Sequence, residues 1–511
     1  MTPKIKALDL RPSKPKPAVK PVKPAAAQRQ YAAAQYTAMT GDWNPAKTTV
    51  NEEISSSAAL VTARMRQLVR DNPHFSRAVK LTSTYIVGSG IRYQSQVKTP
   101  DGVLINKLNQ YIEDKYNAWL ENIDVSGRLH GYDLQTLCCD QLSECGEFIM
   151  IRRIDSKRSD GVMPLRYQII EPDALSSIHS EGFGGVVGAQ GTNGISQGIE
   201  YDRMTYKPIR YHFMEYGIDG QVSMESFALP ASQVIHRFRT LRPGQIRGIS
   251  DFASGILLAD AYRSYFESEL SRKAMAARWL AFVKSPDPLK FQSGLGNDTT
   301  DSGARLEDMD NATIQYLNPM EDIVLPTVPA DTGLSDFSRI VLQMYSVATG
   351  IPYEALTQDY GSMSFSTAKI KRTDLKNEIK PAQRRFIRWQ CQPIMEDFFK
   401  YGILSGYLDL SEAAGLNYAE GIWQPPGFEP VDPLREVKAV IEEIKAGLRS
   451  PQEYIRTRGG DPEEVLAEIS EFKSLSESYG LNFDAALTQA STMMANAPSK
   501  IDNDGEANEQ G

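Results

Sequence analysis

The chain has 511 residues, of which 41% are hydrophobic and 23% are charged, and its formal net charge is −8. This length allows roughly two to four domains, or one subunit built of several parts. The acidic balance argues against a protein that coats nucleic acid through bulk charge, but it permits one past which nucleic acid slides. The four cysteines contain no Cys-x-x-Cys pair, so we expect reduced, mostly buried thiols and no zinc site.

Both ends of the chain have the composition of unstructured tails. The first 24 residues contain six lysines, one arginine and six prolines, which favours extended, solvated chain over packed structure. We expect residues 1–48 to be a basic, proline-rich tail that either has no partner or contacts a scaffold or coat protein. Residues 488–511 are expected to form a second disordered tail. No apolar run reaches the about eighteen residues of a membrane span, so no membrane partner is expected.

Helices and strands alternate through the first half of the chain. Asp71-Asn72-Pro73 interrupts a long helical pattern over 51–87, and the serines at 55–57 are candidate caps for its first part. The glycine-rich stretch 182–198 lacks the helical context of a dinucleotide site, so it favours a hairpin or a disordered loop. The further predicted elements are a strand over 91–96, helices over 106–120 and 133–142, a strand over 146–153, and β structure from Leu165 to Phe238.

The centre of the chain, from Ile249 to about Tyr401, contains two helical arms around a short β module. The first arm, 249–277, carries one apolar stripe at steps of three or four, and its length of about 40 Å is more typical of a strut than of a core helix. The stripe consists of Phe252, Ile256, Ala259, Tyr262, Phe266 and Leu270. The module 278–333 has short apolar runs typical of strands, at 279–283, 313–317 and 323–325. The second arm, 334–350, ends at Gly350-Ile351-Pro352.

A polar loop over 351–366 separates the second arm from a long basic helix. From Lys369 to Arg388 there are eight basic residues against two acidic ones, Asp374 and Glu378, which gives a local charge of +6. Such a run is either a solvated helix face that pairs with acidic neighbours in an oligomer, or a surface that contacts phosphates without reading bases.

The remainder of the chain is predicted to be mostly helical. Pro381 and Pro393 should kink or interrupt the basic helix. Trp423-Gln424-Pro425-Pro426 has the pattern of an extended segment that docks back on the body. Further helices are expected over 434–446, after Pro451 and after Pro462.

No motif for nucleotide hydrolysis or metal binding is present. The chain contains no Gly-x-x-x-x-Gly-Lys-Ser/Thr loop and no His-Glu-x-x-His helix, so neither a P-loop ATPase nor a zinc protease is expected. The five histidines are scattered and never paired at ligand spacing. His236 lies in an apolar strand, which favours a satisfied core or interface histidine over a catalytic one. We therefore expect no enzymatic site, no metal and no cofactor.

Two sequence blocks, in this order, carry a resemblance to a known family. Val234-Ile235-His236-Arg237-Phe238, followed by Arg242-Pro243-Gly244-Gln245-Ile246-Arg247-Gly248-Ile249-Ser250, leads into the first arm. Thr349-Gly350-Ile351-Pro352-Tyr353-Glu354-Ala355-Leu356-Thr357-Gln358-Asp359, followed by the serine-rich turn 362–366, comes after the second arm. Both blocks resemble the lambda-like family of phage portal proteins. The resemblance extends from about Ser55 to Leu481.

The resemblance implies an α+β fold and an elongated portal subunit of several parts. It would have an α/β wing, a long helical stem, a small β-containing clip and a helical C-terminal region. The implied boundaries are a wing over 49–248, stem helices over 249–277 and 334–350, a clip over 278–333, a tunnel loop over 351–366, a long kinked helix returning to the wing over 367–430, and a crown-like helical region over 431–487.

The same resemblance implies which residues face DNA. The tunnel loop would line the narrowest part of a DNA channel, and the start of the basic helix would lie near the DNA. The implied channel residues are Thr357, Gln358, Asp359, Tyr360, Ser362, Met363 and Ser364. The basic residues expected near DNA are Lys369, Lys371, Arg372 and Lys376.

As a function, the resemblance implies a non-enzymatic ring, a homododecamer in this family, at one vertex of a virion capsid. The ring would conduct double-stranded DNA without sequence specificity during packaging and ejection. Its implied partners are the terminase large subunit, a head-tail connector or adaptor, and capsid and scaffold proteins, with assembly in the host cytoplasm. The alternative is an intracellular DNA-binding enzyme or adaptor that uses a basic helix at 366–400. A catalytic cluster and monomeric or dimeric behaviour would favour the alternative.

Overall fold

The computed structural model describes residues 45–155, 161–176, 179, 193–216, 222–284, 306–309, 312–317, 333–361, 363–413, 415–428, 433–458 and 460–479. The chain divides into two compact units, residues 1–49 and 50–511. In the first unit residues 45–49 are described, and they form neither helix nor strand. The predicted tail at 488–511 lies outside the described residues, as does most of the tail at 1–48. No described helix is both long enough and apolar enough to cross a bilayer.

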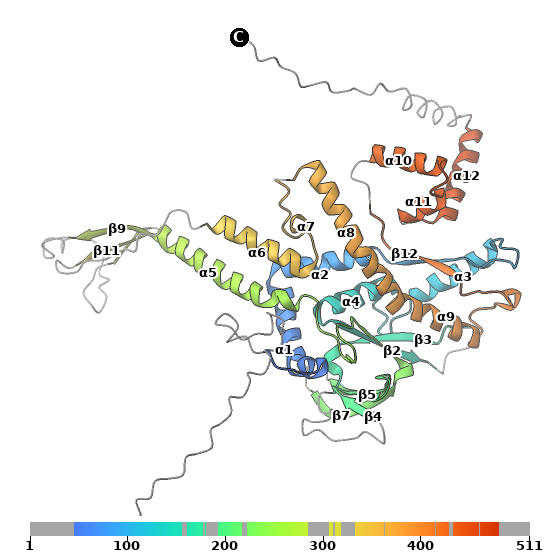
Figure 1. Cartoon of the computed structure of the whole chain (residues 1–511), viewed down its shortest axis with the longest axis horizontal. Helices are drawn as coiled ribbons and strands as arrows, with labels where there is room; N and C mark the ends of the chain where they lie inside the picture. Colours follow the sequence, from blue (N-terminus) through green and yellow to red (C-terminus); the bar gives the residue numbers. More distant parts are fainter. Residues whose placement is uncertain are drawn as a thin grey trace, which may run out of the picture. The chain divides into compact units, whose positions relative to one another are not determined.

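Two helices, α1 (Val50–Asp71) and α2 (Pro73–Ile86), open the second unit (Figure 1). The predicted break between them is confirmed. The Asn72 side chain accepts hydrogen bonds from the backbone N–H groups of His74 and Phe75, at 3.0 and 3.3 Å. This cap satisfies donors that the first turn of α2 cannot pair internally, so the chain restarts as a new helix here.

The predicted serine cap of the first helix is wrong. The helix begins at Val50, five residues before the serines, because Val50 and Ile54 are already buried on its inner face. Ser56 and Ser57 lie inside the helix, where both hydroxyls donate to the Glu53 carbonyl oxygen. A serine inside a helix can satisfy its hydroxyl in this way, so serine alone does not mark a helix start.

The strands of the first half form antiparallel sheets, which confirms the β structure predicted from Leu165 to Phe238. The sheet orders are β3-β2-β8 and β4-β5-β6-β7. The strands are β1 (Arg92–Ser95), β2 (Glu147–Ile154), β3 (Leu165–Ile170), β4 (Asn193–Ser196), β5 (Ile199–Asp202), β6 (Pro208–Tyr216), β7 (Val222–Pro230) and β8 (Val234–Phe238). Antiparallel strands beside separate helices make this an α+β fold, which confirms the predicted class.

The main core lies between the β3-β2-β8 sheet and helices from both halves of the sequence. Helix α3 (Asn106–Leu120) has the predicted bounds, and α4 (Gly131–Glu144) is slightly longer than predicted. The Trp119 ring stacks on Phe398 at 5.4 Å, and its Nε1 donates to the Leu165 carbonyl oxygen at 3.0 Å. The core is therefore closed by a helix that arrives almost three hundred residues later in the sequence.

The later segment returns to the core in two elements. Helix α9 (Gln392–Leu404) supplies Phe398, and strand β12 (Gly421–Gln424) pairs antiparallel with β1. Buried Asp397 accepts from Arg152 at 2.5 Å and from the Tyr167 hydroxyl at 2.6 Å. The predicted docking of the 423–426 segment on the body is thus confirmed at Trp423 and Gln424.

Two long helices, α5 (Ile256–Arg278) and α6 (Leu334–Thr349), correspond to the predicted arms and run side by side (Figure 1). Tyr345 of α6 packs edge-on against Tyr262 of α5 at 6.1 Å, and its hydroxyl donates to the Leu258 carbonyl oxygen at 3.3 Å. Aromatic packing with a satisfied hydroxyl holds the two helices together.

The first arm begins later than predicted. The chain over 249–252 is non-helical, and a 3₁₀ turn (Ala253–Gly255) precedes α5. Ser250 explains the delay, because its Oγ donates to the Ser143 carbonyl oxygen at 2.5 Å and accepts from Phe252 N–H at 3.1 Å. The apolar spacing of the segment continues through this turn, so periodicity alone could not place the helix start.

A small sheet follows the first arm. Its strands are β9 (Trp279–Lys284), β10 (Leu306–Met309) and β11 (Ala312–Leu317), with β11 antiparallel to β10 and parallel to β9. The strands predicted at 279–283 and 313–317 are confirmed. The strand predicted at 323–325 lies outside the described residues.

The long basic helix is interrupted between its two prolines, as predicted. Helix α8 (Phe365–Phe386) contains Pro381, a π-helical segment (Ile387–Cys391) follows, and Pro393 lies in the first turn of α9. A π turn is wider than an α turn by one residue, so the prolines are accommodated without ending the helix. The chain then continues to α10 (Pro433–Lys445), α11 (Pro451–Thr457) and α12 (Pro462–Ser478).

A buried ion cluster fixes the connection from the β sheet to the first arm. Glu147 on β2 accepts from Gly248 N–H at 2.6 Å, lies 2.6 Å from an Arg247 Nη2 and 2.9 Å from His236 Nε2. Burial alone would raise the pKa of Glu147, but Arg247 and His236 overcome this and lower it to about 2. His236 is thus the satisfied core histidine that the sequence predicted.

The same connection also requires a glycine. A Cβ at Gly248 would lie 2.3 Å from the Gly146 carbonyl oxygen, so the two backbones approach too closely for any other residue at this position.

We predict that Glu147→Gln lowers the free energy of unfolding by about 3–5 kcal/mol, because it leaves the Arg247 charge buried without its partner. The folded-state pKa of Glu147 lies below its unfolded value, so this contribution is complete above about pH 4.5 and is lost as the pH falls toward 2. Urea unfolding of the parent and the variant between pH 7 and pH 2.5 measures both effects. The exposed control Glu121→Gln should change stability by no more than about 0.5 kcal/mol. If the two variants were destabilised equally, Glu147 would have no special role. If the difference in stability between parent and Glu147→Gln did not change with pH, the charge of Glu147 would not be its cause.

Candidate functional site

The predicted polar loop after the second arm is half helix. Pro352 precedes α7 (Tyr353–Thr357), and Gln358 ends this turn in the left-handed region with φ of 61°. Leu356 is 2% exposed and belongs to the cluster of buried residues that α2, α5 and α6 share. The first half of the loop is therefore packed on the body.

Arg77 of α2 holds the packed half of the loop in place. Its Nε donates to the Ala355 carbonyl oxygen at 2.6 Å. With the Gln358 amide oxygen turned toward α2, that oxygen accepts from the two terminal nitrogens of Arg77 at 3.1 and 3.2 Å. One guanidinium thus binds both the carbonyl end of α7 and the residue at which the chain turns, in the manner of a C-terminal cap.

Lys371, predicted to lie near DNA, is instead paired within the subunit. Its ammonium group forms an ion pair with Glu354 of α7, whose side chain is 13% exposed. The pair ties α8 to α7 across the loop. The Glu354 carboxylate thus offsets the Lys371 charge, and the position of Lys371 near DNA stays a prediction.

The tip of the loop is exposed and polar. Gln358, Asp359 and Tyr360 are exposed, with Tyr360 at 58%. The Asp359 carboxylate accepts from Gly361 N–H at 3.3 Å and from the Tyr353 hydroxyl at 3.3 Å, which closes a tight turn. The tip therefore projects side chains while its backbone is held by short-range hydrogen bonds.

The other predicted channel residues divide into three groups. Thr357 and Met363 are half-buried, and Ser362 lies outside the described residues. Ser364 is exposed but has a structural role, because its Oγ accepts from Thr367 N–H at 3.3 Å and caps α8. The structure thus brings Asp359 and Tyr360 together at the exposed tip and places Thr357 and Ser364 at its two ends.

A ridge of cations runs along α8 and into the π-helical segment that follows it. We call it the basic ridge and define it as Arg372, Lys376, Lys380, Arg384 and Arg388, at successive steps of four. None of these five side chains forms a salt bridge with another described residue, and Lys369 is likewise exposed without one, although Glu453 lies near Lys380. Like charges at this spacing repel on a helix, so the ridge is a local field of positive charge.

The basic ridge gains a cation from outside its own helix. Burial lowers the pKa of Lys380, the neighbouring Lys376, Arg384 and Arg449 lower it further, and Glu453 opposes them. Arg449 precedes α11; its Nη2 donates to the Thr457 Oγ1 at 3.2 Å, and its Nη1 pairs with Glu443 at 3.4 Å, which offsets part of its charge. Sequence reasoning missed this residue, because nothing local to it indicates that it folds against a helix sixty residues earlier.

The described residues contain no arrangement typical of catalysis. No group of three or more potential metal ligands is found among them. Gly194 to Gly198 matches the spacing Gly-x-Ser-x-Gly, but Ser196 ends β4 and a tight hairpin leads directly into β5. A nucleophile elbow requires a strand-to-helix turn, which is not present here. The four cysteines are buried and free, and burial raises the pKa of Cys139 and Cys391.

Comparison with known proteins assigns the chain to a family. Residues 36–383 match the model of the family described as phage portal protein, lambda family. The chain belongs to this family. The match includes both arms, the exposed tip and most of α8. Portal proteins of this family are structural proteins, so the alternative interpretation as an enzyme is wrong.

Individual portal proteins are similar along most of the chain. The probable portal protein of Halomonas phage phiHAP-1 is 24% identical over 421 residues, covering 80% of this chain and 79% of its own length. Portal protein B of Escherichia phage lambda is 20% identical over 478 residues, covering 83% and 85%. The portal protein of Escherichia phage N15 is 21% identical over 493 residues, covering 86% and 88%.

The structural likeness is weaker. A chain from the neck of a native GTA particle, computed with C12 symmetry, matches 79% of this chain and 94% of its own length, at 13% identity and a TM-score of 0.40. That degree of similarity is too low to support an argument about function.

We predict that Arg77→Ala loosens the loop 351–366 without unfolding the subunit. The change removes the donors to Ala355 and Gln358, so chymotryptic cleavage after Tyr360 should rise several-fold. The melting temperature should fall by only a few degrees, because the lost contacts are local and partly exposed. The exposed control Arg210→Ala on β6 should change neither quantity. If the variant is cleaved at the parent's rate, Arg77 does not hold the loop.

Proposed function

We propose that this portal protein assembles into a closed ring, a dodecamer as the family implies, at one vertex of a virion capsid. The ring conducts double-stranded DNA during packaging and ejection. The observation that carries this proposal is the family match combined with a pair of long helices whose apolar residues a single subunit leaves uncovered. Leu257 and Leu270 of α5 are 72% and 60% exposed, and Val347 of α6 is 84% exposed. Apolar surface of this extent favours contact with other chains.

In this ring the parts of the subunit take the roles that the family implies. The α/β part, 49–248, is the wing, and α5 with α6 forms the stem. The small sheet within 278–333 is the clip, and the segment 351–366 is the tunnel loop. The helices over 431–487 form the crown-like region. The tail at 1–48 is proposed to contact capsid or scaffold protein while the ring assembles in the host cytoplasm.

The chemistry of the loop tip supports a sliding contact with DNA. A conduit must touch a polyanion without holding it, since every tight phosphate contact has to be broken at each translocation step. The tip offers a carboxylate, a phenol and an amide, and the Lys371 ammonium behind it is neutralised by Glu354. Weak polar contacts of this kind let the duplex move, whereas a ring of unpaired cations would release counterions and bind it.

The basic ridge supports a separate, longer-range role. From Arg372 to Arg388 it extends about 24 Å along α8 and the start of the π-helical segment, which corresponds to roughly seven phosphates of one strand. We propose that it sets a positive potential behind the loop and retains packaged DNA, with Arg372 and Lys376 nearest to the duplex. None of its side chains forms a salt bridge with another described residue, so the field is offset only in part within the subunit, by Glu453 near Lys380.

We predict that Tyr360→Arg slows DNA packaging several-fold while rings still form. The new cation would bind phosphates at the constriction, and the copies in the ring multiply the effect. The matched change Tyr360→Ser keeps the tip polar and uncharged, so it should package like the parent. Packaging yield and ring formation are to be measured on the same preparations. Parent-like packaging by the arginine variant would show that the tip does not face DNA.

The ridge is tested in the same assay with Arg372→Ala combined with Lys376→Ala. This variant should fill heads normally but lose packaged DNA faster than the parent at low salt, and the difference should shrink as salt weakens retention by the parent. Assembly defects without loss of DNA would mean instead that the ridge pairs with acidic groups of a neighbouring subunit.

The clip is the proposed docking surface for the terminase large subunit and, later, for the head-tail connector. Its three described strands are too few to bury a core alone, so neighbouring clips are proposed to complete the sheet around the ring.

We predict that deleting residues 285–302 leaves rings intact and abolishes terminase binding. These residues join β9 to β10 and lie outside the described part of the chain. Pull-down of terminase by purified rings measures the effect, with electron microscopy of the same sample as the control. Broken rings would place the segment in the ring's core.

A further inference from the structure

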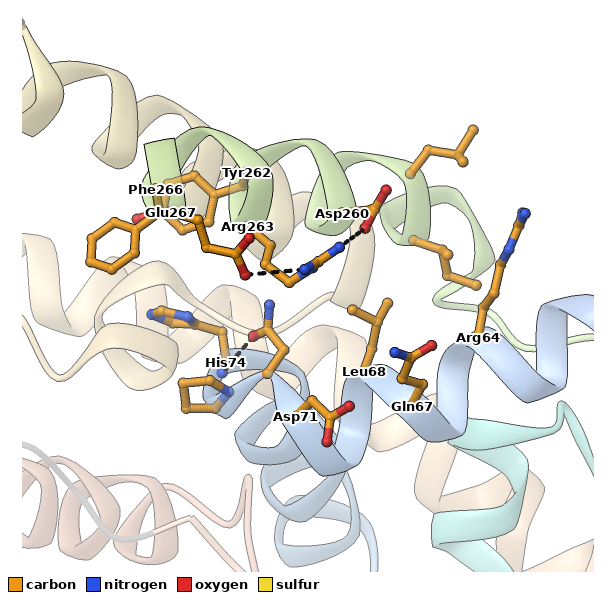
Figure 2. Close-up of a pocket in the computed structure, with 14 residues that line it drawn as sticks. Arg64, Gln67, Leu68, Asp71, His74, Asp260, Tyr262, Arg263, Phe266 and Glu267 are labelled. Atoms are coloured by element: carbon orange, nitrogen blue, oxygen red, sulfur yellow. Dashed lines mark hydrogen bonds and ion pairs between the residues drawn. The ribbon is translucent and has the colours of Figure 1, made fainter. Parts of the chain in front are cut away.

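A cavity of about 720 Å³ lies between α1, the start of α2 and α5 (Figure 2). Leu68 and Asp71 stand on the α1 side, and Leu257, Phe266 and Glu267 stand on the α5 side. Leu257 and Phe266 are 72% and 47% exposed. The subunit therefore presents an apolar hollow with charged edges that it does not fill with its own described side chains.

A second unpartnered surface lies on α6. Ile340, Met344 and Val347 follow one another at steps of four and three, so they form one stripe along the helix. They are 54%, 53% and 84% exposed, while Val341 and Tyr345 on the opposite side are buried. A helix that is apolar on both sides is typical of one buried in a larger assembly.

The hollow and the stripe lie at the same level of the paired helices. Tyr262 of α5 packs against Tyr345 of α6, and Tyr265 packs against Phe337 at 4.4 Å. The α5 residues that line the hollow are therefore alongside the α6 residues of the stripe. In a cyclic ring, neighbouring copies are related by rotation alone, so surfaces that meet must lie at equal height along the axis. Paired helices that run along the axis meet this condition.

The charges around the two surfaces are also complementary. The hollow is lined by the carboxylates of Asp71, Asp260 and Glu267 and by the guanidiniums of Arg64 and Arg263. Arg263 pairs with Asp260 and Glu267 within exposed turns of α5 (Figure 2), and such pairs are weak enough to be exchanged.

Arg339 supplies the matching charge. It is exposed on α6 beside Ile340, and no ion-pair partner of it is found among the described residues. A cation without a partner at the edge of an apolar stripe fits the acidic edge of the hollow.

We propose that the α6 stripe of one copy packs into the α1–α5 hollow of the next copy, with Arg339 pairing with Glu267 or Asp260. The occupant of the hollow is thus a second copy of this chain, in a head-to-tail contact that repeats around the ring. This inference rests on the proposed ring and names the surfaces that build it.

The test separates the two surfaces. Val347→Asp destroys the stripe and leaves the hollow, whereas Phe266→Asp destroys the hollow and leaves the stripe. Each variant alone should have the mass of a monomer by light scattering, at concentrations at which the parent forms rings. A one-to-one mixture of the two variants retains one intact junction, so it should form dimers of twice the monomer mass and no rings.

Both substituted side chains are exposed, so the monomers should melt within a few degrees of each other. Met204→Asp is the matched control, because Met204 is 89% exposed on the turn after β5, and this variant should form rings like the parent.

Arg339→Glu should raise the protein concentration at which rings form at least tenfold. Adding Glu267→Arg to this variant should bring that concentration most of the way back to the parent's value. The proposed contact between stripe and hollow would be wrong if either aspartate variant formed rings, or if their mixture stayed monomeric. Neither outcome would contradict the proposal that the parent forms a ring. A parent that forms no rings would overturn the proposed function as well.

Discussion

The buried carboxylate of Glu147 fixes the geometry on which the rest of the subunit depends. It binds the backbone of Gly248 and the side chain of Arg247, which lie in the segment that connects the β sheet to the first arm. A charge taken out of water must be fully paired, so the segment has one arrangement in which its polar groups are satisfied. The close approach of Gly146 and Gly248 removes the remaining freedom. The sheet and α5 are consequently joined by a rigid corner and not by a linker, and the direction in which the long helices leave the α/β part is set at a single point.

That rigidity explains why the arms carry so much uncovered apolar surface. A helix pair that leaves a body at a fixed corner is packed on its inner side alone, through residues such as Tyr262 and Tyr345. Its outer sides cannot fold back to bury themselves. In the ring proposed above, other copies would supply the missing contacts, so the assembly would be the stable form of the subunit.

Much of the architecture could be predicted from the sequence, because it is encoded locally. The helix over 106–120, the break at Asn72 and the second arm all follow from periodicity and cap residues. The site was less accessible, since its contacts join distant segments. Neither the Arg77 contact with Ala355 nor the Lys371 pair with Glu354 has a sequence signal, because each depends on how α2, α7 and α8 pack. The late start of α5 was missed for the same reason, as Ser250 is bonded to Ser143 more than a hundred residues away. The family resemblance rested on contiguous blocks and was confirmed.

The π-helical segment between α8 and α9 has a consequence for how this protein tolerates change. Phe398 locks the rotation of α9 in the main core, while Leu375 and Ile379 lock that of α8 against its own neighbours. A continuous α-helix would impose one phase on both ends, and each inserted residue would turn one end by about 100° relative to the other. The extra residue of the π turn is what reconciles two independently fixed phases. A change that rotates α8 can therefore be absorbed at the wide turn 387–391 without rotating Phe398 in the main core.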